Sequence, residues 1–204
     1  MFLVAFFFYI DGVYTIIDMA TAYGSALGLN STGLLLALLV TQLVAFPFAI
    51  IFGRLASKYS TGRLITACII AYIGITVFAV FMKSQWQFWV LAIFVGMFQG
   101  GIQALSRSYF AKIIPSERSG EYFGLMDICG KGASFLGTLV VGAASQIFGN
   151  INIGVSMIVL LFTAGLVLFI MTDKLDSKEA DLNIENGMIA NNSFCLLYTS
   201  DAAD

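Results

Sequence analysis

Residues 96–131 read GMFQGGIQALSRSYFAKIIPSERSGEYFGLMDICGK. Two apolar segments flank a short hydrophilic turn at residues 115–119. Polar residues recur in these segments at steps of four: Gln99, Gln103 and Arg107 in the first, Asp127 and Lys131 in the second. Because residues four apart share one face of a helix, the pattern predicts two helices, each with an apolar side and a polar stripe.

The whole chain is too hydrophobic for a soluble domain. Of its 204 residues, 59% are hydrophobic and 11% are charged, and the mean hydropathy is +0.92. Soluble domains carry about 25% charged residues. The apolar residues come in blocks of roughly 20, the length that crosses about 30 Å of hydrocarbon as a helix. We therefore expect an all-α integral membrane protein.

Six such blocks predict six transmembrane helices, at about residues 2–27, 33–52, 64–82, 88–110, 121–148 and 153–172. We expect residues 1–172 to form one six-helix bundle, with no signal peptide before it. Residues 173–204 are polar and acidic, which predicts a mobile cytoplasmic tail. The last ten residues, CLLYTSDAAD, resemble translated adapter sequence, so we assign them no function.

Basic residues gather in alternate loops, on one side of the predicted bundle. They are Arg54, Lys58 and Arg63 after the second span, Arg107, Lys112 and Arg118 around the fourth turn, and Lys174 and Lys178 after the sixth span. The opposite side has only Lys83. The positive-inside rule then places both ends of the chain in the cytoplasm. We expect the bacterial cytoplasmic membrane, or the vacuolar membrane if the source is eukaryotic.

The first predicted span carries two carboxylates, Asp11 and Asp18, on one helix face together with Thr15. A charge at mid-membrane costs about 2.5–3.5 kcal/mol, so each carboxylate needs a partner or a watery cavity. One interpretation is a structural ion pair with a neighbouring helix. The other is a site that binds a proton or a substrate amine, for which Asp11 is the stronger candidate.

The polar stripes of residues 96–131 also allow two interpretations each. Lys131 lies about 15 Å deep by helix rise, so it either pairs with Asp127 or is shared between Asp127 and Asp11. The second arrangement would couple protonation to conformation. Gln99 and Gln103 could bridge helices or line a cavity.

Arg107 either extends to the headgroups or joins this cavity. Two pairs of glycines at steps of four predict close approach between helices: Gly96 with Gly100, and Gly120 with Gly124.

Several classes of function fit the composition poorly. Histidine is absent and the three cysteines lack ligand spacing, so we expect no metal and no other cofactor. No basic patch indicates nucleic acid. An intramembrane serine protease needs a histidine, and an aspartyl mechanism would need Asp11 and Asp127 to share a proton. We therefore expect no enzyme. A six-helix channel or scaffold subunit that acts as a homodimer remains one candidate.

Residues 53–63, GRLASKYSTGR, resemble the signature loop of the major facilitator superfamily, which joins the second and third helices of a six-helix half. The corresponding positions are Gly53, Arg54, Leu55, Ala56, Lys58, Gly62 and Arg63. Ser57 stands where the signature has an acid, and Ser60 stands where it has a second glycine.

Three further segments are similar to the carboxyl-terminal half of the vacuole effluxer family, a branch of that superfamily related to autophagy-linked vacuolar amino-acid exporters. They are YIDGVYTIIDMA at residues 9–20, GGIQALSRSYFAKIIP at 100–115 and EYFGLMDICGK at 121–131. The resemblance covers residues 1–172. It implies a twelve-helix transporter to which this chain contributes the last six helices, with a missing amino-terminal half as partner.

From these residues we expect a secondary transporter that moves small polar solutes across a lipid bilayer by alternating access. The resemblance makes amino acids the best substrate hypothesis. Asp11 would bind a proton, Asp127 and Lys131 would relay charge, and residues 53–63 would form a cytoplasmic latch. The candidate solute- or proton-binding residues are Asp11, Asp18, Gln99, Gln103, Arg107, Asp127 and Lys131.

Overall fold

The computed structural model describes the backbone of residues 1–26 and 28–200, and the side chains of the same residues except 116, 177 and 179–200. This part of the chain forms α1 (Phe2–Ala26), α2 (Ser31–Leu55), α3 (Thr61–Val80), α4 (Gln85–Ile113), a 3-10 turn η1 (Ser116–Arg118), α5 (Ser119–Phe148) and α6 (Ile151–Ser200). Each helix overlaps one predicted span, which confirms the all-α class with six helices.

All six helices are long and apolar enough to cross a membrane. The shortest, α3, has 20 residues, or about 30 Å of helix at 1.5 Å per residue. In α6 the membrane-compatible stretch is Ile151–Asp176. Large apolar side chains such as Leu43 and Phe46 on α2 lie exposed on the outside of the bundle, as expected where a helix faces lipid. The chain is therefore a multi-pass integral membrane protein.

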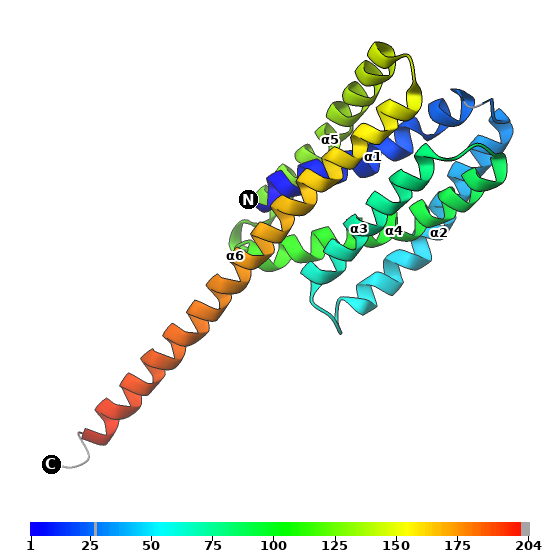
Figure 1. The fold of residues 1–204 in the computed structure, drawn as a ribbon. Coiled ribbons are helices and arrows are strands. Elements are labelled where there is room, and N and C mark those ends of the chain that lie inside the picture. The colour runs from blue at the N-terminus through cyan, green and yellow to red at the C-terminus, as the bar shows by residue number, and fades with distance from the viewer. Residues whose placement is uncertain (27, 201–204) are drawn as a thin grey trace.

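Helix α1 packs against each of the other five helices, and Figure 1 shows these helices running side by side. Its inward face is aromatic. Phe2 stacks on the ring of Tyr109 with centroids 5.2 Å apart, and the hydroxyl of Tyr9 lies 2.7 Å from that of Ser106. Every residue that α1 presents to the core therefore affects several helices at once.

The turns between helices alternate between the two ends of the bundle. At one end, Lys112 donates to Thr61 at 2.9 Å and Tyr109 donates to Asp176 at 2.7 Å, which joins α4 to α3 and α6. At the other end, Tyr23 donates to a carbonyl of α3 at 2.7 Å. The basic segments thus share one end, while the side of the membrane that this end faces stays a prediction.

Glycines bring α2 and α4 unusually close together. A Cβ atom at Gly96 would lie 2.6 Å from the Thr41 carbonyl oxygen, and one at Gly100 would overlap the backbone of Ala45. This confirms the first predicted glycine pair. The second is wrong, because no described atom lies within 4 Å of a Cβ built at Gly120 or Gly124.

The predicted tail and the predicted signature loop are both more helical than expected. Helix α6 runs past residue 172 to Ser200, where the composition predicted a mobile tail (Figure 1). The side chains of the adapter-like segment, 195–204, all lie outside the described part of the chain, and the boundary between bundle and tail stays a prediction. The signature segment is shorter as a loop than expected, because α2 extends to Leu55 and α3 begins at Thr61.

Candidate functional site: a polar pocket and a buried carboxylate

A polar pocket of about 120 Å³ lies between α1, α4 and α5. Its lining residues are Phe6, Ile10 and Tyr14 from α1, Gln103 and Arg107 from α4, and Met126, Asp127, Gly130 and Lys131 from α5. Four of the seven candidate residues therefore meet in one place, two from α4 and two from α5.

Arg107 and Asp127 join α4 to α5 across this pocket. Their side chains form an ion pair at 2.8 Å, with 60% and 48% of their surfaces exposed. At 1.5 Å per residue, Arg107 lies about 9 Å from the end of α4 and Asp127 about 12 Å from the start of α5, inside the spans. Arg107 lines the polar pocket, which is the second of its two interpretations. Of the two interpretations for Lys131, the pair with Asp127 does not occur, because Asp127 binds Arg107.

The reason is that spacing along a helix gives a shared face but says nothing about the neighbouring helix. Arg107 of α4 reaches across the pocket, and its guanidinium group binds the Asp127 carboxylate of α5. Lys131 lines the same pocket on the next turn of α5, and no ion pair of Lys131 occurs among the described residues. The pocket therefore presents a paired cation, a paired acid and a second, unpaired ammonium group.

Asp11 lies outside this pocket, sealed between α1 and α5. It is 0% exposed, and its Oδ1 accepts a hydrogen bond from the Gly137 N–H at 3.0 Å. Its Oδ2 has no hydrogen-bond partner in the described part of the chain. The two alternatives that gave Asp11 a cationic partner, a neighbouring-helix ion pair or a share of Lys131, are therefore not realised in this conformation.

The two other candidates lie apart from both places. Asp18 is exposed on α1, and neither it nor Gln99 lines the polar pocket. Gln99 is 8% exposed, and its Oε1 is buried without a hydrogen-bond partner among the described residues. Asp11 and Asp127 likewise have different partners, Gly137 and Arg107, so the structure does not bring them together as an aspartyl pair.

The signature segment meets α4 and α6 through its second half. Gly62 is buried, and a Cβ atom there would overlap the carboxylate of Asp173 on α6. Tyr109 of α4 donates to Asp176 at 2.7 Å and to Asp173 at 3.2 Å. The other signature residues lie around this contact: Gly53, Arg54 and Leu55 end α2, Ala56 and Lys58 are in the turn, and Arg63 is exposed in the first turn of α3.

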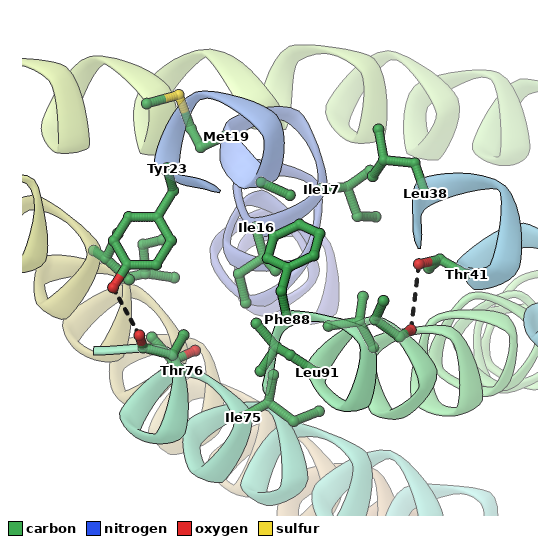
Figure 2. A pocket seen from close by; sticks show the side chains of 16 residues that line it. Ile16, Ile17, Met19, Tyr23, Leu38, Thr41, Ile75, Thr76, Phe88 and Leu91 are labelled. Atoms are coloured by element: carbon green, nitrogen blue, oxygen red, sulfur yellow. Dashed lines mark hydrogen bonds between the residues drawn. The ribbon is translucent and has the colours of Figure 1, made fainter. Parts of the chain in front are cut away.

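A second, apolar pocket of about 50 Å³ lies toward the opposite end of the bundle. Figure 2 shows the side chains of Ile16, Phe88 and Leu91 converging on it from α1 and α4. Thr41 borders it, and its hydroxyl lies 3.3 Å from the carbonyl oxygen of Ala92 (Figure 2). The same hydroxyl lies 2.9 Å from the carbonyl oxygen of Ala37 in its own helix, so its one proton is shared between two acceptors. No charged side chain lines this pocket, which fits a packing gap better than a site for a polar solute.

Some site residues carry no signal in the sequence. Gly137 touches Asp11 from 126 positions away, and no local pattern marks it. Tyr14 lines the polar pocket although it reads as one more aromatic residue in an aromatic span. Thr15 could have been selected, because it follows Asp11 by one helical turn.

The fold and these two sites define a class: a six-span unit of a helical membrane transporter, with a polar pocket inside the membrane-spanning region. Residues 1–181 match the family described as vacuole effluxer Atg22 like, and the chain belongs to that family of transporters within the major facilitator superfamily.

The chain is 47% identical over 168 residues to the uncharacterized MFS-type transporter YxiO of Bacillus subtilis, covering 82% of this chain and 39% of that protein. It is 29% identical over 201 residues to autophagy-related protein 22 of Coccidioides immitis, covering 88% and 33%. Autophagy-related protein 22 of Saccharomyces cerevisiae is 29% identical over 194 residues, covering 89% and 37%. The chain thus spans between 33% and 39% of the length of these relatives.

Proposed function

We propose that this chain forms the last six helices of a twelve-helix secondary transporter, which moves a small polar solute by alternating access with proton coupling at Asp11. The observation that carries the proposal is the gathering of Gln103, Arg107, Asp127 and Lys131 in one pocket. Charged groups within a membrane span are rare and mark transport pathways. Transporters of this kind place the solute between two facing repeats.

The chemistry of the pocket favours a solute that carries both charges or a carboxylate. The unpaired ammonium of Lys131 can hold an anionic group, while Gln103 offers an amide on the facing helix. The Arg107–Asp127 pair is half exposed, so a solute with an amino and a carboxylate group could exchange with either partner. An amino acid has this chemistry.

Coupling between the proton and the solute has a short structural route. Asp11 and the pocket share the same two helices, because Ile10 and Tyr14 of α1 and Lys131 of α5 line the pocket. The Asp11 carboxylate bonds the backbone of α5 at Gly137. Any change in charge at Asp11 that alters the α1–α5 contact would therefore move the pocket walls.

The same proposal includes an orientation in the membrane, with both termini and the signature segment in the cytoplasm. The contact of Tyr109 with Asp176 and the close approach of Gly62 to Asp173 would act there as the latch between helices. Cysteine-accessibility labelling at Lys58 and at Lys83 would test this, with Lys58 expected to be reached only from the cytoplasmic side.

The reading frame on both sides of the coding segment tests the twelve-helix architecture. Six further apolar spans upstream would support it, whereas a stop codon directly before Met1 would favour a homodimer of six-helix subunits. The product of the complete reading frame should then be reconstituted in liposomes and supplied with a panel of radiolabelled amino acids under an imposed pH gradient.

Replacing Lys131 tests the pocket itself. We expect Lys131→Ala to raise the KM at least tenfold, because a hydrogen bond to a charged group contributes about 1.5–3 kcal/mol. Lys83→Ala is the matched control, since Lys83 lies at the opposite end of the bundle. An unchanged KM in Lys131→Ala would remove the pocket from the transport pathway.

A further inference from the structure

Thr15 differs from the other buried hydroxyl residues of this bundle. A serine or threonine inside a helix ordinarily donates to the carbonyl four residues earlier. Four other buried residues do so at 2.6–2.9 Å: Thr41, Thr76, Ser106 and Thr172. Thr15 is 0% exposed, yet its Oγ1 has no hydrogen-bond partner among the described residues. Its hydroxyl is turned away from its own helix.

Gly137 defines what the hydroxyl faces. A Cβ atom built at Gly137 would overlap Thr15 Oγ1 and would lie 3.1 Å from Asp11 Oδ1. Both side chains are therefore pressed against the same point of α5, which only a glycine leaves open. The two unpartnered oxygens of this interface, Asp11 Oδ2 and Thr15 Oγ1, belong to adjacent turns of α1 at one small site.

Among the residues whose side chains are described, none offers a charge close enough to balance an ionised Asp11. From α6, the ring of Phe162 closes against Gly12, and from α4, Ser106 bonds Tyr9. The charged groups of the adjoining helices lie elsewhere: Arg107, Asp127 and Lys131 in the polar pocket, and Asp18 on the exposed face of α1. Burial without a neighbouring cation favours the protonated, neutral form of a carboxyl group over the ionised form.

We propose that Thr15 completes the proton site of Asp11. Asp11 Oδ2 takes up the proton and donates it as a hydrogen bond to Thr15 Oγ1, which faces α5 and not its own helix. The terminal torsion of an aspartate is soft, so a small rotation brings the two oxygens into contact. One proton then satisfies both unpartnered atoms.

A metal cation fits this site less well. Hard cations take six or more oxygen ligands in proteins, and the site offers two unpaired oxygens among apolar side chains. The inference rests on the proposed role of Asp11 as the proton site, and it adds Thr15 and Gly137 as residues that position the carboxyl group. With α1 and α5 in contact, the conformation described here is the one that holds the proton.

Infrared difference spectroscopy tests this without a transport assay, because a protonated carboxyl group has a C=O band separate from that of a carboxylate. The sample is the product of the complete reading frame. The band should be absent in Asp11→Asn. In Thr15→Val, which keeps the shape but lacks the hydroxyl, it should move to higher frequency, and half-protonation should require about a tenfold higher proton concentration.

Two variants separate this effect from a loss of packing. Thr15→Ser retains the hydroxyl and should restore both the band and its pH midpoint. Thr76→Val, at a buried threonine bonded to its own helix, should leave both unchanged. An identical band and midpoint in Thr15→Val and the parent protein would overturn the inference, as would loss of the band on adding Na⁺ at constant pH. A Thr15-dependent band in a protein whose transport ignores the pH gradient would overturn the proposed coupling alone.

Discussion

The α1–α5 contact and the α2–α4 contact both depend on a glycine, but they differ in how well their polar groups are paired. In both, a glycine removes the Cβ atom and lets a neighbouring helix approach: Gly137 opposite Asp11 and Thr15, and Gly100 opposite Ala45. At α2–α4, the hydroxyl of the polar neighbour Thr41 shares its proton between the carbonyls of Ala37 and Ala92. At α1–α5, a carboxylate and a hydroxyl are buried with unpaired oxygens.

This difference separates a packing contact from a site. Polar groups buried in membrane proteins are satisfied unless function needs them otherwise, because an unpaired buried group costs about 1–3 kcal/mol. At the α2–α4 contact, the Thr41 hydroxyl carries none of this cost. Gln85 Nε2, packed near Gly33, is buried without a partner among the described residues, but no described carboxylate is buried beside it. We therefore interpret this contact as structural. At the α1–α5 contact, the unpaired polar atoms belong to or lie next to Asp11, the only carboxylate that is fully buried among the described residues.

Gly137→Ala is expected to have the largest effect of the variants that probe this comparison. Its new methyl group would overlap Thr15 Oγ1, which can rotate away, and would lie 2.9 Å from Thr15 Cβ, which cannot. The α1–α5 contact must therefore shift slightly, and we expect the fold to survive this shift. The site would change, however, and pH-driven transport should fall at least tenfold. Gly142→Ala in the same helix is the control, because no described atom lies within 4 Å of its Cβ position. Full pH-driven transport in Gly137→Ala would show that the α1–α5 contact, like the α2–α4 contact, has only a structural role.

Gly100→Ala should show the opposite pattern. Its methyl group meets the backbone of Ala45, which cannot rotate away, and overpacking of this kind destabilises by about 1–3 kcal/mol. The melting temperature in detergent should fall, while transport per folded molecule and its pH dependence stay as they were. Gly74→Ala, at an open position on α3, should not lower the melting temperature. A shifted pH dependence in Gly100→Ala would contradict a purely structural α2–α4 contact.

Thr41→Val is expected to have the smallest effect. It removes a hydroxyl that donates to Ala37 and Ala92, and a net hydrogen bond contributes about 0.5–1.5 kcal/mol. Thermal unfolding should register this loss, and the pH midpoint of transport should not move. A change in that midpoint would place Thr41 in the coupling route and weaken the contrast with Thr15.

The sequence was sufficient for the membrane class and the six spans because both follow from hydropathy over about 20 residues, a property of local composition. It also predicted that Gln103 and Arg107 share one helix face and that Asp127 and Lys131 share another, whereas the meeting of these two faces in one pocket is seen only in the structure. Helix ends were less accurate, since α2 and α3 take in most of the signature segment. Polar residues at the end of a span do not stop a helix by themselves.

Partners across helices could not be predicted. The i,i+4 spacing of Asp127 and Lys131 permits a pair, yet α4 brings Arg107 to within 2.8 Å of the acid. Likewise, Gly120 and Gly124 have the same spacing as Gly96 and Gly100 but face open space. Spacing gives the face of a residue, and only the packing of distant segments decides what that face meets. For this reason, the sequence alone could not identify Gly137 as a partner of Asp11.

The central claim is that proton coupling passes through Asp11 while the solute binds in the separate polar pocket. Its most direct test compares the parent protein with Asp11→Asn, as the product of the complete reading frame in proteoliposomes. The account predicts that Asp11→Asn loses accumulation driven by a pH gradient but still exchanges solute down its concentration gradient. Asp18→Asn, on the exposed face of α1, should retain both. Undiminished pH-driven accumulation in Asp11→Asn would contradict the account.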